Sequence, residues 1–354
     1  MISSECEISS RMSACEGLIR PCFFLQLHIT PFCNLRCIHC YQEFESEKEK
    51  KLLTKNEIIN LIHHYYRFLR IQDHSGTIYL TGGEPTIDPN LLDYVKEAKR
   101  LRIFPMILSN GTLIDSKFAF KLKEAGTGIV QISLDGLKHT HDEIRGKGNF
   151  DKATRGLDAC RQAGLKTIVM FTLHKLNANE MEDVISHCIE HGVKRFAFHR
   201  LVPVGRGSQL FNEIFRPEEL KEFFKKIRKW KNRYRNFIEV TAHDPLWQRF
   251  LGMSHPFGCC IGNSGICVMH NGDILPCRRL NKVIGNIRQD SLHSIWNGSY
   301  LHKFRKRKDY EGKCNSCIHF KKCTGCRGIA YGVTGSEFGS DPQCFSFKKR
   351  KIID

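Results

Sequence analysis

The sequence predicts an α/β fold in which strands and helices alternate along a parallel sheet, followed by a smaller cysteine-rich region. Apolar runs of strand length alternate six times with amphipathic segments of helix length before residue 200, and this alternation is typical of parallel sheets. From residue 258 the composition changes, and nine of the 17 cysteines lie between Cys259 and Cys344. A chain of 354 residues is long enough for about two domains.

The predicted strands are short apolar runs bounded by turn residues, and the helices between them carry apolar residues at helical spacing. The first strand stops at Pro31, and the first helix starts with a capping box formed by Thr54 and Glu57. The predicted strands cover 23–30, 77–80, 103–108, 128–134, 166–173 and 195–199. The predicted helices cover 54–69, 91–99, 117–124, 151–162, 180–191 and 217–235.

Three cysteines follow the first predicted strand directly. Cys33, Cys37 and Cys40 have the spacing C-x3-C-x2-C and lie on the loop at the carboxyl end of that strand. Three thiolates can hold three irons of a [4Fe–4S] cluster, and because no fourth ligand follows locally, one iron stays open to another ligand. A structural zinc site would need four closed ligands, usually in paired C-x2-C units.

The second predicted strand ends in a tight turn, Gly82-Gly83-Glu84-Pro85. The glycines permit close approach of the backbone, and the turn presents a carboxylate that can accept hydrogen bonds from an ammonium group. Polar residues also follow the later strands. Because chemistry in βα barrels lies at the carboxyl ends of the strands, we expect these loops to form one site.

Together, the cysteine loop and the GGEP turn resemble the radical S-adenosylmethionine (SAM) superfamily. The resemblance implies a partial (β/α)6, TIM-like barrel, and a cluster whose open iron binds the amino and carboxylate groups of SAM. It implies that one electron, from a flavodoxin- or ferredoxin-type donor, cleaves SAM to a 5′-deoxyadenosyl radical, which abstracts a hydrogen atom from the substrate. The chain is therefore expected to be a radical SAM oxidoreductase.

The resemblance also implies which residues contact SAM. It puts the GGEP turn at the amino group, Arg145 at the carboxylate, and His39, where the family usually has an aromatic residue, against the adenine. Four residues at strand ends are expected at the ribose or the carboxylate, although Asn-Gly and Asp-Gly also favour turns without a ligand. These four are Ser109, Asn110, Ser133 and Asp135.

A second cysteine array lies near the C-terminus. It contains the run Cys314-x2-Cys317-x5-Cys323-x2-Cys326, preceded by Cys259, Cys260, Cys267 and Cys277 and followed by Cys344. On ligand count alone, two zinc ions and two Fe–S clusters fit equally well. The dipeptide Asn271-Gly272 between apolar runs predicts a hairpin in this region.

The array resembles the SPASM extension of radical SAM enzymes, which usually holds two auxiliary [4Fe–4S] clusters. Carried over by position, the outer cluster would be held by Cys314, Cys317, Cys323 and Cys344. The inner cluster would be held by Cys260, Cys277 and Cys326, with Cys259, Cys267 or no residue as the fourth ligand. The predicted domains are an N-terminal lead (1–21), the radical SAM barrel (22–215), a basic bridging helix and connector (216–255) and the SPASM domain (256–354).

The formal charge of +18 indicates either an acidic partner or a basic solvated surface. The sequence has no run of about 18 apolar residues and no signal-peptide pattern, so we expect a cytoplasmic protein without membrane contact.

The resemblance favours a peptide or protein substrate, possibly acidic, because SPASM enzymes mostly act as peptide maturases that form, for example, thioether or carbon–carbon cross-links. The alternative is a tetrapyrrole or other cofactor-pathway enzyme, such as one that oxidatively decarboxylates a haem precursor, and a polycarboxylate substrate would also suit the charge. RNA modification is less favoured, so a nucleic-acid partner is not expected, and the GGEP turn argues against a non-enzymatic scaffold. No catalytic acid or base is assigned, and Asp273 and Asp341 are only weak candidates.

Overall fold

The computed structural model describes residues 20–42, 51–242, 244–252, 258–320 and 322–350. The predicted N-terminal lead (1–21) lies outside these residues except for its last two positions. In the part of the chain that the model describes, no helix is both long and apolar enough to cross a membrane.

One sheet of ten strands runs through the described residues, in the order β10-β9-β8-β1-β2-β3-β4-β5-β6-β7. Strands β1 to β6 are neighbours in chain order and pair in parallel, which confirms the predicted α/β architecture. Their bounds are β1 Cys22–Thr30, β2 Ser75–Gly82, β3 Phe104–Ser109, β4 Ile129–Ser133, β5 Lys166–Leu173 and β6 Arg195–Arg200.

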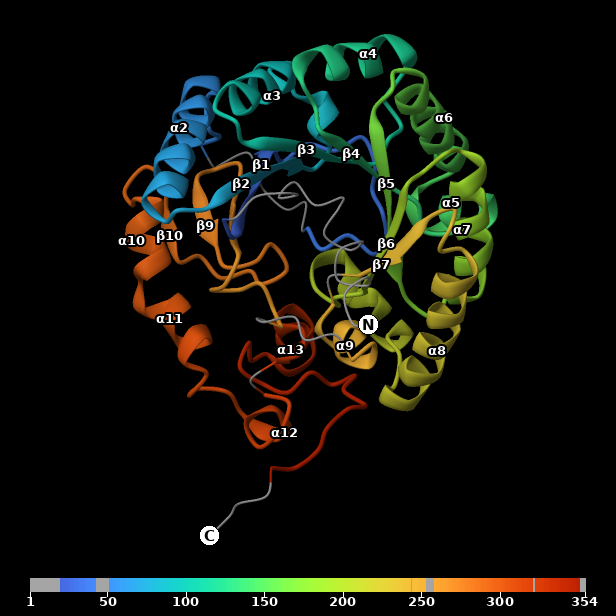
Figure 1. The fold of residues 1–354 in the computed structure, drawn as a ribbon, viewed down its shortest axis with the longest axis vertical. Helices are drawn as coiled ribbons and strands as arrows, with labels where there is room; N and C mark the ends of the chain where they lie inside the picture. Colours follow the sequence, from blue (N-terminus) through green and yellow to red (C-terminus); the bar gives the residue numbers. More distant parts are fainter. Residues whose placement is uncertain (1–19, 43–50, 243, 253–257, 321, 351–354) are drawn as a thin grey trace, which may run out of the picture.

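Helices cover the outer face of this curved sheet (Figure 1). The capping box predicted at the start of α2 is present, since the Thr54 hydroxyl accepts from the Glu57 amide and the Glu57 carboxylate accepts from the Thr54 amide at 2.8 Å. The helix bounds are α2 Lys55–Ile71, α3 Leu91–Arg100, α4 Ser116–Ala125, α5 Lys138–Arg145, α6 Asn149–Gln162, α7 Met181–Glu190 and α8 Pro217–Arg233. Three 3-10 turns are η2 Pro85–Ile87, η3 Ala178–Glu180 and η4 Gly205–Glu213.

Helix α5 is a feature that the sequence patterns did not predict. It begins without a side-chain cap and is followed by Gly146 as its C-cap, and it buries only Thr140, His141 and Ile144, two of which are polar. Such a segment lacks the apolar stripe that identifies most helices. The helix matters for function because its last residue is Arg145.

The connector and the cysteine-rich region add strands to both edges of the sheet. Strand β7 pairs in parallel with β6, and β8 pairs in parallel with β1. Strands β8 and β9 form the hairpin predicted at Asn271-Gly272, and β10 pairs with β9. The added strands are β7 Glu239–Thr241, β8 Gly265–Val268, β9 Asp273–Leu275 and β10 Gly285–Asn286. The barrel and the cysteine-rich region therefore share one sheet, and the predicted boundary at residue 256 stays a prediction.

The remaining helices belong to the connector and the C-terminal region. In Figure 1, α10 and α11, coloured orange, follow the edge of the molecule downward from β10, and α12 and α13, coloured orange-red to red, lie in the lower part of the view, away from β3 and β4. Their bounds are α9 Pro245–Phe250, α10 Leu292–Asn297, α11 Ser299–Lys306, α12 Gly312–Asn315 and α13 Arg327–Thr334.

The main hydrophobic core lies between the sheet and the helices. Alternate residues of β1, namely Phe23, Leu25 and Leu27, are buried there, and Tyr65 of α2 donates a hydrogen bond of 2.7 Å to the carbonyl of Phe23. Each such buried apolar side chain contributes about 1.5–3 kcal/mol. This packing fixes the strands and so holds together the loops at their carboxyl ends.

Candidate active site

The loops at the carboxyl ends of the strands surround one cavity. It contains about 980 Å³ of empty space, counted out to its mouth. The predicted residues on its wall are Cys33, Cys37, His39, Cys40, Gly82, Gly83, Ser109, Asn110, Ser133 and Arg145. Glu84, Pro85 and Asp135 are buried and do not form part of this wall.

The three thiols of the cysteine loop lie close enough to influence one another's ionisation. Burial raises the pKa of Cys37 to about 11, and the neighbouring Cys40 and Cys33 add to this shift while Arg145 opposes it. Iron is bound by thiolates rather than thiols. The Arg145 guanidinium, whose Nη1 lies 3.9 Å from the Sγ atom of Cys37, therefore stabilises the form of the cysteine that binds iron.

Asp135 organises this side of the site. Its Oδ2 atom lies 2.5 Å from Nε of Arg145 and 3.0 Å from Nε2 of His39, and its Oδ1 atom accepts a hydrogen bond of 2.6 Å from the amide of Thr172. Burial alone would raise the pKa of Asp135, but the charges of Arg145 and His39 hold it well below its ordinary value. The Asp135 carboxylate thus orients two side chains that face the cavity, and its predicted contact with SAM stays a prediction.

Glu84, predicted to lie at the amino group of SAM, accepts several hydrogen bonds within the protein. Its Oε1 atom accepts hydrogen bonds from the hydroxyls of Ser109 and Thr86, each at 2.7 Å, and its Oε2 atom accepts one of 2.7 Å from the amide of Asn110. The carboxylate is fully buried and ties the loop after β2 to the loop after β3. Its predicted role at the amino group of SAM stays a prediction.

The two glycines of the turn are explained by a close approach to the cysteine loop. A Cβ atom on Gly82 would lie 2.2 Å from the carbonyl oxygen of Thr30, and one on Gly83 would lie 2.1 Å from that of Phe32. No larger residue fits there unless the backbone moves. The glycines thus let the turn pack directly against the loop that carries the three thiols.

Among the other strand-end residues, Asn110 and Ser133 differ in the number of hydrogen bonds that their side chains make within the protein. The side chain of Asn110 donates 2.9 Å to Asn34 and accepts from the amide and hydroxyl of Thr112, as expected for turn chemistry. Within the described residues the hydroxyl of Ser133 has no hydrogen-bond partner, and it lies on the cavity wall. Ser133 is therefore the better placed of the two to bind a ligand.

The outer set of predicted cluster ligands comes together in the cysteine-rich region. Cys314, Cys317, Cys323 and Cys344 line one pocket of about 410 Å³ of empty space. The predicted combination of four cysteines from three separate segments is thus compatible with a single centre.

The predicted inner set also lies together, and the structure favours one of its possible fourth ligands. Cys260 interacts electrostatically with Cys259, Cys277 and Cys326. A hydrogen bond from Cys260 lowers the pKa of Cys259, and burial and the charge of Cys259 raise the pKa of both Cys277 and Cys326, so Cys259 lies near all three. Cys267 lies on β8, where its thiol contacts the sulfur of Met269 at 3.9 Å.

Over the described ranges, no group of three histidine, cysteine, aspartate or glutamate side chains converges closely enough to bind one metal ion. The geometry of the thiols leaves both interpretations of the array, zinc ions and Fe–S clusters, open.

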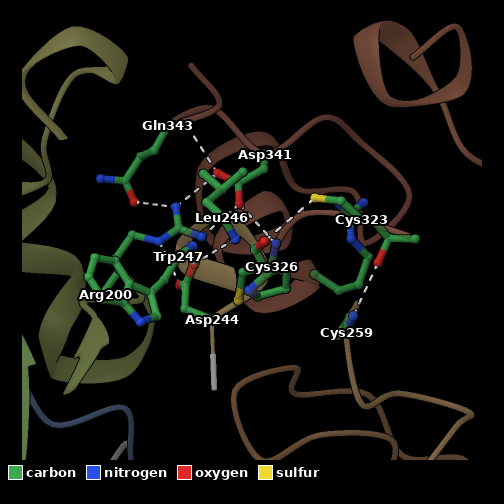
Figure 2. A network of polar contacts seen from close by, with 12 residues as sticks. Arg200, Asp244, Leu246, Trp247, Cys259, Cys323, Cys326, Asp341 and Gln343 are labelled. Atoms are coloured by element: carbon green, nitrogen blue, oxygen red, sulfur yellow. Dashed lines mark hydrogen bonds and ion pairs between the residues drawn. The ribbon is translucent and has the colours of Figure 1, made fainter. Parts of the chain in front are cut away.

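Arg200, at the end of β6, joins the cavity to the auxiliary cysteines. Figure 2 shows its guanidinium between Asp244 on one side and Asp341 and Gln343 on the other, with hydrogen bonds of 2.7, 2.8 and 2.9 Å. Asp341 also accepts a hydrogen bond of 2.8 Å from the amide of Cys326. One buried arginine on the cavity wall thus holds both the connector and a predicted ligand of the inner cluster.

Sequence reasoning placed Arg200 at the end of the sixth strand without assigning it a role, and it did not single out Arg278 or Arg279. All three arginines lie on the cavity wall. A signal was present, because Arg200 ends the sixth strand and Arg278-Arg279 directly follows Cys277. The sequence does not show that the loop after β6 and the loop after Cys277 meet at the same cavity.

Known proteins resemble both parts of the chain. Residues 27–188 match a family model described as the radical SAM superfamily, and residues 259–318 match SPASM, described as an iron-sulfur cluster-binding domain. An AdoMet-dependent heme synthase of Oleidesulfovibrio alaskensis is 30% identical, covering 93% of this chain and 88% of that protein. An Fe-coproporphyrin III synthase of Methanosarcina barkeri is 31% identical, covering 91% and 87%. The mycofactocin maturase MftC of Mycolicibacterium smegmatis is 26% identical, covering 90% and 82%.

Solved structures share the fold at lower identity. Native anSMEcpe with bound AdoMet aligns with a TM-score of 0.71 at 21% identity, covering 92% of this chain and 94% of that one. Streptococcus suis SuiB bound to its precursor peptide SuiA aligns with a TM-score of 0.73 at 18% identity, covering 92% and 76%. These similarities confirm the partial barrel with a C-terminal SPASM region.

Proposed function

Because the chain belongs to the radical SAM superfamily and carries a SPASM iron–sulfur cluster-binding domain, we propose that its substrate is a tetrapyrrole with carboxylate side chains. The family brings a [4Fe–4S] cluster with SAM and auxiliary Fe–S clusters. The SPASM resemblance by itself favours a peptide substrate, but the relatives at 30% and 31% identity are named as a heme synthase and an Fe-coproporphyrin III synthase. These names support the alternative hypothesis instead.

The residues of this chain fit the cofactors that the family brings. Cys33, Cys37 and Cys40 would hold the SAM-binding cluster, with Arg145 next to them as counter-charge. When bound there, cluster and SAM supply a 5′-deoxyadenosyl radical that removes a hydrogen atom from the substrate. The two auxiliary sets would be Cys314, Cys317, Cys323 and Cys344, and Cys259, Cys260, Cys277 and Cys326.

The choice of substrate rests on two arginines of the cavity wall. Arg278 and Arg279 line the cavity, and no carboxylate of the described residues forms an ion pair with either. Tyr41 holds Arg278 in place, because the Arg278 Nη1 donates 3.0 Å to the phenol oxygen and the guanidinium lies 4.5 Å from the ring centroid. Guanidinium groups bind carboxylates in a bidentate manner. A substrate with several carboxylates would therefore be recognised next to the cysteine loop.

The reaction that suits such a substrate is oxidative decarboxylation of a propionate side chain. Loss of one hydrogen atom from the carbon next to the macrocycle, followed by loss of CO2 and one electron, converts –CH2–CH2–COO⁻ into a vinyl group. The hydrogen atom ends in 5′-deoxyadenosine, and the electron must leave through a one-electron acceptor. The arginines would hold the carboxylates, so that the reacting carbon faces the radical source.

The test is incubation of the anaerobically reconstituted enzyme with SAM, dithionite and iron-coproporphyrin. We expect a product lighter by the elements of formic acid for each converted side chain, detected by mass spectrometry. In Arg278→Met/Arg279→Met, the KM for the porphyrin should rise at least about tenfold, since each charge-assisted hydrogen bond contributes about 1.5–3 kcal/mol. SAM cleavage without substrate should persist. Arg155→Met, which changes an exposed arginine of α6, is the matched control.

A peptide substrate is the second candidate. It is supported by the similarity to the maturase MftC and by the fold shared with SuiB bound to a precursor peptide. Absence of any porphyrin product, together with new cross-linked masses in peptides of cells that express the gene, would reject the tetrapyrrole proposal in favour of this one.

A further inference from the structure

Arg327 is a fully buried arginine that contacts both auxiliary sets of cysteines. It is the first residue of α13 and directly follows Cys326, a predicted ligand of the inner set. Its Nη2 atom lies 3.9 Å from the Sγ atom of Cys314, a predicted ligand of the outer set. Besides the hydrogen bond from Cys260, the charge and the backbone amide of Arg327 lower the pKa of Cys259 in the inner set. The side chain thus contacts the outer set, whereas the main chain contacts the inner one.

Uncharged groups hold the guanidinium of Arg327 in place. Its Nη1 atom donates hydrogen bonds of 3.1 Å to the carbonyl of Glu337 and 2.6 Å to that of Gly339, and the guanidinium lies 5.0 Å from the centroid of the Tyr310 ring. The Nε–H group is buried and has no acceptor among the described residues. Two carbonyls and one ring therefore fix the orientation of the guanidinium, but they do not neutralise its charge.

The charge of Arg327 also lacks a carboxylate partner. Arg200, which is buried nearby, forms ion pairs with both Asp244 and Asp341. In the part of the chain that the structure describes, no carboxylate forms an ion pair with Arg327. A buried charge without a counter-charge is strongly unfavourable. The thiolates of the auxiliary sets are the anionic groups that lie next to this guanidinium, so they are its natural counter-charge.

We propose that Arg327 is a positioning residue of the outer cluster, whose charge balances the thiolates and raises the reduction potential of that cluster. Reduction adds an electron to an anionic centre, so a fixed positive charge beside a ligand sulfur stabilises the reduced form more than the oxidised one. Net charge and hydrogen bonds to the sulfurs are among the factors that set the potential of an Fe–S cluster. The inner cluster should respond less, because its contact with Arg327 includes the backbone amide, which every substitution retains.

This role of Arg327 depends on the auxiliary clusters that the SPASM domain brings and not on the identity of the substrate. A redox titration without substrate therefore tests it independently of the porphyrin assay.

The test is a redox titration of the anaerobically reconstituted enzyme, followed by electron paramagnetic resonance. Cys317→Ala, which lacks a predicted ligand of the outer set, identifies the potential that belongs to the outer cluster. In Arg327→Met we expect that potential to fall by at least about 59 mV, a tenfold change in the ratio of reduced to oxidised cluster, and the inner potential to change less. Arg327→Lys keeps the charge, so its outer potential should stay closer to that of the wild type.

Arg305→Met is the matched control. Arg305 also donates to two carbonyls, those of Gly262 at 2.7 Å and Trp296 at 2.6 Å, and its guanidinium lies 4.2 Å from the centroid of the Trp296 ring. Among the described residues, no thiol is a hydrogen-bond partner of Arg305. Its loss should leave both auxiliary potentials unchanged, and iron analysis of every variant reports whether the clusters remain intact.

Arg327→Gln is the second neutral variant, to be used if Arg327→Met loses iron, because its amide can still donate to one carbonyl. The proposal is overturned if a neutral variant that keeps its iron has an unchanged outer potential, if Arg327→Lys falls as far as the neutral variants, or if Arg305→Met shifts the potential equally. Loss of the outer irons in all three Arg327 variants would leave the residue a purely structural role, and zinc in the outer set of the wild type would contradict the proposal as well.

Discussion

The cysteine loop and the outer cysteine pocket hold thiols for the same purpose but are built in different ways. The loop takes Cys33, Cys37 and Cys40 from eight consecutive residues, and the charged side chains of Arg145 and Asp135 support it. The outer pocket takes its four cysteines from a stretch of 31 residues, 314–344. The first centre is therefore specified mainly by local sequence, whereas the second depends on tertiary contacts that hold distant segments together.

The largest effect is expected from the loop. Cys37→Ala leaves two local thiolates for a cluster that needs three, so reductive cleavage of SAM should be abolished. The measurement is anaerobic release of 5′-deoxyadenosine with dithionite. Cys160→Ala, which alters a buried cysteine of α6 away from both centres, should retain cleavage. Normal release from the Cys37 variant would show that this loop is not the SAM-binding site.

A cysteine of the outer pocket should behave differently. Cys317→Ala should still cleave SAM without substrate, because the radical forms at the other centre, but it should lose product. Iron content should fall from about twelve per chain, for three clusters of four irons, to about eight. If this variant turns over normally, the outer centre is dispensable; if iron is replaced by stoichiometric zinc in the wild type, the pocket binds zinc and not a cluster.

Arg200 tests the contacts between the two regions. In Arg200→Met, the carboxylates of Asp244 and Asp341 stay buried without their partner, which should lower the free energy of unfolding by about 3–5 kcal/mol. Urea unfolding of the reconstituted enzyme measures this change. Arg100→Met, which breaks an exposed ion pair with Glu97, should cost less than about 1 kcal/mol. Equal losses in the two variants would mean that the Arg200 network does not hold the regions together.

The smallest effect is expected at β8. Cys267→Ala should leave the iron content unchanged, because its thiol faces Met269, whereas Cys259→Ala should lose the irons of one cluster, about four per chain. Iron analysis of the two variants side by side decides between the two candidate ligands. The opposite pattern would assign the inner cluster to Cys267.

Much of this architecture could be predicted because local patterns encode it. Strands β1 to β6 are apolar runs with turn residues after them, and the Asn271-Gly272 dipeptide marks its hairpin clearly. Strands β7 and β8, with three and four residues, carry too little pattern to be recognised alone. They form because the edges of the sheet offer unpaired backbone groups.

The side-chain partners could not be predicted in the same way. The motif identified Glu84 and Asp135, but a pattern of residue types does not say which atoms a carboxylate will contact. Glu84 accepts hydrogen bonds from the loop after β3. Asp135 forms an ion pair with Arg145, which ends a helix that the sequence patterns did not predict. Arg200 is hydrogen-bonded to Asp341 and Gln343, which lie 141 and 143 positions further along the chain. These contacts exist only in the folded chain.

The pairing of β8 with β1 limits how such enzymes can be truncated in the laboratory and how their halves can be exchanged in evolution. Residues 24–27 of the first strand are hydrogen-bonded to a segment that begins at position 265. A shortened chain ending before that segment would expose the edge of β1, an apolar strand of nine residues, and exposed apolar strand edges are a recognised cause of aggregation. Exchange of the C-terminal half between enzymes would therefore succeed only where the incoming piece can dock on the same edge.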